Sequence, residues 1–196
     1  KWSNTSNVAD EFQMFNSDSG SFDNDSEMVL LGYDGSDDDT GGFFEELADS
    51  GLATGSDRDL DSGTFDPKKF LFFELSGMGN STGNTKEFRF NGNSDGVYSW
   101  NGQEDSAGSV TGNTQTQTQI GQDQNVQTNN VGFIYNNANY QKIGMNWGVK
   151  SNAPNIGQCM FCFKWAETSN PITSIQFRAE NQLIASGSSL RVWGSD

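Results

Sequence analysis

Residues Gln158–Glu167 read QCMFCFKWAE, and this stretch indicates the fold class. Phe161, Phe163 and Trp165 occupy every second position, so in an extended chain their side chains share one face. Alternation of this kind over a short run is typical of a half-buried β-strand. The stretch therefore predicts a strand whose aromatic face contributes to a core.

Similar short runs follow one another from Phe65 onward. Turn residues rich in Asn, Gly, Ser and Asp separate several of them. Many short strands at this spacing predict an all-β protein, an antiparallel, jelly-roll-like β-sandwich. The other predicted strands are KKFLFFELSGM (68–78), EFRFNG (87–92), VYSWNG (97–102), VGFIYNN (131–137), YQKIGMNWGVK (140–150), ITSIQFRAE (172–180) and LRVWG (190–194).

The first 66 residues are polar and contain only short apolar runs. Glu11–Phe15 and Met28–Tyr33 predict two further strands. Gly41–Gly51 reads GGFFEELADSG and is the best helix candidate, because its apolar residues recur at helical spacing and Gly51 is a natural stop. The predicted fold therefore includes one short connecting helix.

The net charge of −15 is concentrated in the first third of the chain. Residues 1–66 contain 17 of the 26 acidic residues, with Lys1 and Arg58 as the basic ones. We therefore divide the chain into an acidic N-terminal arm, 1–27, and a β-sandwich domain, 28–196. Such an acidic surface repels phosphate backbones, which argues against a nucleic-acid partner. No apolar run approaches the ~20 residues that span a bilayer, so no membrane insertion is expected.

The sequence offers little for catalysis, because it contains no histidine. We expect no enzyme activity, no catalytic residue and no cofactor other than calcium. The best calcium candidate is Asp57, Asp59 and Asp61, which alternate in DRDLD and would share one side of an extended segment. A solvated acidic loop is the favoured alternative, since Lys68 stands where a calcium loop would place its last glutamate.

Three further features have a structural and a functional interpretation. Cys159 and Cys162 lie three positions apart on a predicted strand, so they face opposite sides and are not expected to form a disulfide; both are expected to be small buried side chains. Asn113–Gly121 (NTQTQTQIG) is polar on both faces, so it cannot be a core strand; it predicts an exposed edge, with pairing to a neighbouring subunit as the alternative. Three aromatic side chains stand beside polar loops and could stack on a sugar ring: Trp100, Tyr140 and Trp147. Packing in the core or at its rim is the favoured interpretation.

The C-terminal stretch NPITSIQFRAENQLIASGSSLRVWGSD (170–196) resembles the end of virion structural proteins from bacterial and archaeal viruses, especially marine ones. Two earlier segments, LDSGTFDPKKFLFFELSG (60–77) and FRFNGNSDGVYSW (88–100), resemble the middle of the same proteins. The resemblance covers about 28–196. It implies a jelly-roll-like sandwich that assembles in a virus particle, and it carries over no catalytic residues. The matching positions near the C-terminus are Ile172, Ile175, Phe177, Ser186–Gly187 and Leu190–Gly194.

Together these observations predict a structural subunit of a virus particle (capsid, decoration or tail appendage), located in the extracellular virion. Its expected partners are copies of itself, other structural proteins of the particle and a host glycan. One alternative is a cell-surface filament subunit that donates Lys1–Phe15 to the next sheet. Another is a secreted carbohydrate-binding module. Glycosylation sequons occur at Asn4, Asn24 and Asn80, in polar turns.

Overall fold

The computed structural model describes Ser21 and residues 43–77, 82–104, 108–124, 128–152, 155–179 and 182–196. The chain divides into two units, 1–40 and 41–196, and the second contains every described residue except Ser21. The predicted domain boundary at residue 27, the predicted strands before residue 34 and the three sequons lie outside the described residues. Over the described ranges the chain has twelve strands and no helix, so no membrane-spanning helix occurs there.

The twelve strands confirm the prediction of an all-β protein and include all eight strands predicted after Phe65. They are β1 (Glu45–Asp49), β2 (Asp59–Asp61), β3 (Phe70–Ser76), β4 (Thr82–Phe90), β5 (Tyr98–Glu104), β6 (Gly108–Gln115), β7 (Thr118–Gln124), β8 (Thr128–Tyr135), β9 (Lys142–Asn152), β10 (Asn155–Trp165), β11 (Ile175–Ala179) and β12 (Ser189–Ser195).

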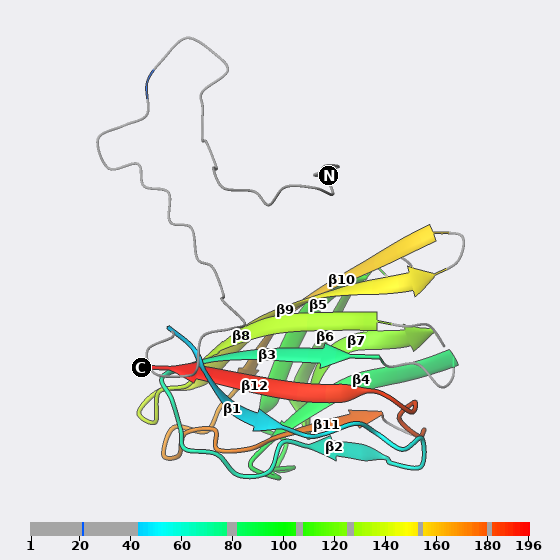
Figure 1. Cartoon of the computed structure of the whole chain (residues 1–196). Helices are drawn as coiled ribbons and strands as arrows, with labels where there is room; N and C mark the ends of the chain where they lie inside the picture. Colours follow the sequence, from blue (N-terminus) through cyan, green and yellow to red (C-terminus); the bar gives the residue numbers. More distant parts are fainter. Residues whose placement is uncertain are drawn as a thin grey trace. The chain divides into compact units, whose positions relative to one another are not determined.

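Eight of the strands pair in a nested order. β1 pairs with β12, β2 with β11, β3 with β8 and β4 with β7, all antiparallel. The chain is therefore folded back on itself, and these pairs are distributed over two sheets, β1-β12-β3-β8 and β2-β11-β4-β7 (Figure 1). Two four-stranded antiparallel sheets with this order form a jelly roll, which confirms the predicted fold class.

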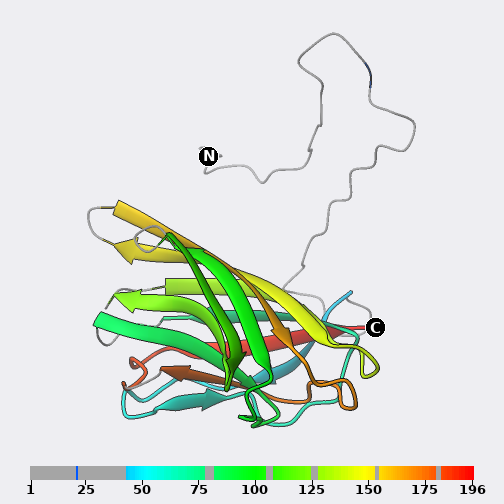
Figure 2. The same ribbon diagram turned by 180° about the vertical axis from the view of Figure 1, so that it is seen from behind.

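Two inserted hairpins enlarge one of the two sheets. β5 and β6 lie between β4 and β7 in the sequence, and β9 and β10 lie between β8 and β11. Both hairpins join the sheet beyond β8 in the order β8-β9-β10-β5-β6, so this larger sheet has eight strands and the smaller one four (Figure 2). The insertions give the molecule one sheet face that is much broader than the other.

One aromatic core lies between the sheets. β3 reads FLFFELS, and its alternate residues Leu71, Phe73 and Leu75 are fully buried. Phe73 packs edge-on against Phe88 of β4, with ring centroids 4.8 Å apart. The predicted aromatic face of β10 is confirmed, because Phe161 is fully buried and Phe163 and Trp165 belong to the core. The core also contains Ile175, Phe177, Leu190 and Val192.

Four glycines of the larger sheet make room for core aromatics. Each glycine lies directly opposite an aromatic residue on the neighbouring strand, and a side chain built on it would overlap that ring. The glycine thus lets the ring occupy the space above its backbone, an arrangement that compensates for the weak packing of glycine in strands. The pairs are Gly102 with Phe161, Gly112 with Trp100, Gly132 with Phe73 and Gly144 with Phe163.

The predicted helix at Gly41–Gly51 is wrong, because the segment contains strand β1. An isolated helix of two or three turns is marginal in water, whereas pairing with β12 satisfies the backbone of this segment. The register shifts between Glu46 and Ala48, so Leu47 is the extra residue of a β-bulge. Leu47 and Ala48 therefore both pack against the core, which explains why their spacing resembles that of a helix.

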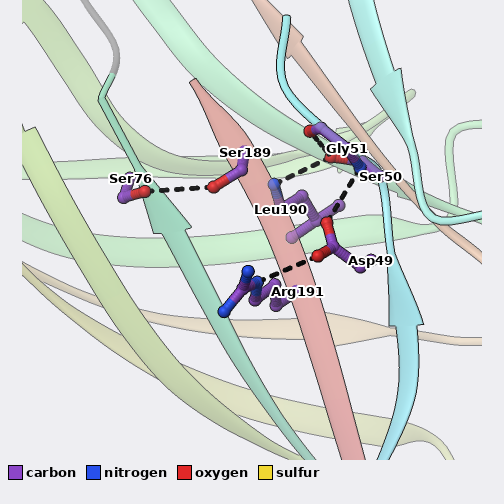
Figure 3. A network of polar contacts seen from close by, with 7 residues as sticks. All are labelled: Asp49, Ser50, Gly51, Ser76, Ser189, Leu190 and Arg191. Atoms are coloured by element: carbon purple, nitrogen blue, oxygen red, sulfur yellow. Dashed lines mark hydrogen bonds and ion pairs between the residues drawn. The ribbon is translucent and has the colours of Figure 1, made fainter. Parts of the chain in front are cut away.

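Polar contacts secure β12 on both sides (Figure 3). On one side, Arg191 Nε lies 3.1 Å from Asp49 Oδ2, and the Leu190 amide donates to Ser50 Oγ at 3.0 Å. On the other, the hydroxyls of Ser189 and Ser76 are 3.2 Å apart. Strand β12 is therefore bonded both to the edge strand β1 and to β3.

Candidate functional site

The polarity of β9 is inverted relative to an ordinary surface strand. Over residues 142–150 its exposed side chains are Ile143, Met145, Trp147 and Val149, all apolar. The alternate residues, which face the smaller sheet, are Lys142, Gly144, Asn146, Gly148 and Lys150; all are polar or glycine, and four of them are buried. An antiparallel sheet with one face in water normally places its polar residues on that face. The outward face of β9 is therefore a candidate contact surface.

The inner side of β9 is polar because its neighbours already fill the core. The ring of Phe163 occupies the space above Gly144. Asn146 is fully buried and donates from Nδ2 to the Ile120 carbonyl at 3.0 Å. Lys142 Nζ donates to the Glu167 carbonyl at 2.8 Å, and burial lowers the pKa of this lysine. A strand with large apolar side chains on this side would overfill the interior.

The apolar side chains of β9 belong to a larger patch. We define the apolar outer face as the large apolar side chains of β3, β8, β9 and β10 that are exposed and point away from the core: Phe70, Phe133, Ile143, Met145, Trp147, Val149 and Met160. They are exposed by 38–56%. Monomeric proteins seldom leave so many large apolar side chains together in water.

Strand register aligns this face into rows that cross the sheet. One row runs from Trp193 through Phe72, Phe133 and Met145 to Cys162, each residue directly opposite the next. The adjacent rows contain Phe70, Tyr135, Ile143 and Lys164 on one side, and Glu74, Val131, Trp147 and Met160 on the other. Charged side chains therefore occur at the ends of the rows, while the middle is apolar.

Part of this surface is already covered by the residues before β1. Phe44 lies over Phe72 and Phe133, with ring centroids 6.4 and 6.3 Å apart respectively. Phe43 packs edge-on against Phe44 at 5.0 Å. These contacts lie over β3 and β8, so the side chains of β9 and β10 form the open half of the apolar outer face.

The aspartates predicted to bind calcium have separate structural partners. Asp57 Oδ2 accepts hydrogen bonds from the amide and the hydroxyl of Thr54. These bonds hold the pKa of Asp57 below its usual value, and the bond from the amide has the larger effect. Asp59 Oδ1 lies 2.8 Å from Arg178 Nε, and Asp61 Oδ1 accepts from the Gly63 amide at 2.9 Å. Among the described residues no three His, Cys, Asp or Glu side chains are grouped to hold a metal ion. The structure does not bring the three carboxylates into one site.

The cysteines follow the predicted geometry only in part. They face opposite sides of β10 and are not bonded to each other, as predicted. Cys159 is buried and Cys162 is exposed, so the prediction that both are buried is wrong for Cys162. Cys162 lies instead in the central row of the outward sheet face, opposite Met145.

The aromatic candidates for sugar stacking do not share a surface. Trp100 packs on Gly112 and against Phe161, with ring centroids 6.0 Å apart, as the packing interpretation predicts. Tyr140 is exposed in the turn after β8, and Trp147 stands in the apolar outer face, so core packing is wrong for these two. The expectation that large aromatic residues are buried is wrong for Trp147. The sequence did contain a signal of this, because the residues that alternate with Trp147 in β9 include glycines and lysines, which are unusual on a core face.

The polar segment Asn113–Gly121 connects the open edges of both sheets. It begins in β6, the edge of the larger sheet, and ends in β7, the edge of the smaller sheet, so the predicted edge position is confirmed. The prediction that it cannot contribute to the core is wrong. Thr118, Gln119 and Ile120 are buried, because β7 lies against β5 and β10.

No family model, no characterised protein and no solved structure matches this chain in comparisons with known proteins.

Proposed function

We propose that this protein is a structural subunit of a virus particle that acts by assembling with copies of itself and with other structural proteins of the particle. The observation that carries the proposal is the apolar outer face of the larger sheet, which is the kind of surface that subunit contacts bury. The jelly-roll strand order and the resemblance of residues 170–196 to the ends of virion structural proteins agree with this role. The fold alone is an argument by analogy, since jelly rolls also occur in lectins and cupins.

Assembly explains features that a monomeric binding module would not need. The inserted hairpin β9–β10 supplies five of the seven side chains of the apolar outer face, and the inward side of β9 is polar. Strand β9 therefore adds surface for contact and little to the core, whereas β10 contributes Phe163 and Trp165 to it. The acidic excess of residues 1–66 keeps such a subunit soluble before it assembles.

The proposal is tested by imaging the purified full chain with negative stain over a range of protein and salt concentrations. A virion subunit forms closed symmetric assemblies, such as rings, capsomers or shells. Open fibres with translational symmetry would indicate a filament subunit instead. A chain that remains monomeric under all conditions, and that binds a glycan array, would contradict the proposal and support a carbohydrate-binding module.

A further inference from the structure

We propose that a second copy of this chain covers the apolar outer face, and that the contact centres on the β9–β10 half that Phe44 leaves open. This inference rests on the proposed function, because it names the partner of the same surface. Three properties of the face support a copy of the chain as the occupant: its area, its charge and its composition.

The area of the face matches one side of a stable interface. If a fully exposed large apolar side chain offers about 200 Å², the seven side chains of the apolar outer face leave on the order of 600 Å² open at their exposures of 38–56%. A standard protein interface buries about 800 Å² on each partner. The half-buried residues Val131, Tyr135 and Trp193 belong to the same rows and supply part of the difference.

The charge distribution favours a copy over a basic partner or an anionic membrane. The chain carries a net charge of −15, so two copies repel each other wherever their acidic regions meet. The rows of the apolar outer face contain Glu74 and Lys164 at their ends and no charge between them. Two acidic copies can therefore approach closely through this neutral surface. Within these rows a basic partner would find only Glu74, and an anionic lipid headgroup only Lys164, as an opposite charge.

The composition of the face is that of a homodimer interface core. Phe, Trp and Met are enriched in such cores, and charged residues are depleted. Trp147 and Met160 are direct neighbours across β9 and β10, and Phe133 and Met145 are direct neighbours across β8 and β9. Two sheet faces can stack about 10 Å apart with their side chains interdigitated. Rows of large apolar side chains of this kind suit such stacking.

The exposed cysteine in the central row provides a direct probe. Cys162 is exposed in the chain alone and lies opposite Met145, whereas Cys159, the only other cysteine, is buried and serves as an internal control. We would pulse-label the full chain with a maleimide at increasing protein concentration and quantify each cysteine by mass spectrometry. Val149→Lys places a charge on the exposed half of the face, and Thr64→Lys places the same charge on an exposed position of the loop after β2, away from this face.

If a second copy covers this face, the labelling rate of Cys162 falls at least tenfold as the wild-type chain associates, and the Thr64→Lys variant behaves in the same way. In Val149→Lys, Cys162 remains reactive at concentrations where the wild type is protected. Assemblies whose Cys162 reacts as fast as that of the monomer would overturn this inference and leave the proposed function standing. A chain that never associates would overturn both. Protection that does not depend on concentration would assign the face to the chain's own remaining residues and overturn the inference alone.

Discussion

The ring of Phe161 on β10 occupies the space above Gly102, which lies directly opposite it on β5. The three nearest atoms to a side chain built on Gly102 all belong to this ring and none to the backbone. The pair is one of four in the larger sheet, and three of the four involve a strand of the inserted hairpins β5–β6 and β9–β10. Because these glycines have no side chain, aromatic rings can lie directly on the backbone of the enlarged sheet. A larger residue at the same positions would overlap those rings.

The Gly102→Ala substitution tests this arrangement. We expect a loss of about 1–3 kcal/mol of unfolding free energy, because the methyl group displaces the buried ring of Phe161. Chemical denaturation measures the loss. In the double variant Gly102→Ala with Phe161→Leu, the smaller leucine makes room for the added methyl group. The losses in the two single variants should therefore sum to more than the loss in the double variant. Simple additivity would show that the ring and the glycine do not interact.

Asn136 connects three parts of the chain beneath the end of β8. Its Nδ2 donates to the carbonyls of Lys68 and Ile172, and its Oδ1 accepts from the Ile172 amide. Because Asn136 is buried, Asn136→Ala leaves these backbone groups without partners, and we expect a loss of about 3 kcal/mol in unfolding free energy. Asn139→Ala, on an exposed residue of the same turn, is the matched control and should change stability by less than about 0.5 kcal/mol. Equal effects would contradict this role.

The ionisation of Tyr98 makes the free energy of unfolding depend on pH in the alkaline range. Burial raises the pKa of its hydroxyl from 10.0 to about 12, and the oxygen accepts from the Phe90 amide at 2.9 Å. The unfolded chain releases this proton first, so the contribution of Tyr98 is complete below pH 10 and is lost as the pH rises from 10 to about 12. The loss is on the order of 2–3 kcal/mol. In Tyr98→Phe, denaturation at several pH values should show a shallower decline over this interval. An unchanged decline would show that other groups cause it.

Calcium should not stabilise the chain through Asp57, Asp59 and Asp61, because each carboxylate has its own structural partner. We expect the melting temperature to respond equally to added Ca²⁺ in the wild type and in Asp61→Asn. A saturable rise that occurs in the wild type and disappears in Asp61→Asn would show that the three carboxylates rearrange around the ion.

The sequence predicts strand positions wherever apolar and polar residues alternate and the apolar ones are buried. In β10 the predicted face of Phe161, Phe163 and Trp165 does face the core, so the local pattern and the tertiary structure agree there. In β1 the local pattern and the tertiary structure disagree, because the β-bulge at Leu47 gives this strand the apolar spacing of a helix. Pairing with β12 is what makes the segment a strand.

The candidate site was not predictable from alternation alone. The sequence of β9 shows two distinct faces, but the side that faces the core depends on what the neighbouring strands place there. The ring of Phe163 fills the space above Gly144, and Asn146 bonds to the Ile120 carbonyl, so the polar side is inward. The nested pairing of β1 to β12 likewise depends on contacts between the two ends of the domain, which no local pattern records.

If copies of this chain associate through the β9–β10 half of the apolar outer face, a charge placed there must weaken the association. Sedimentation velocity of the full chain, with Ile143→Lys compared against Thr64→Lys, tests this most directly. Both positions are exposed and both variants change the charge equally, but Thr64 lies in the loop after β2, away from the face. We predict that Ile143→Lys weakens self-association at least tenfold, equivalent to 1.4 kcal/mol or more, and that Thr64→Lys leaves it unchanged. Equal association of the two variants, or a wild-type chain that sediments as a monomer at every concentration, would contradict the claim.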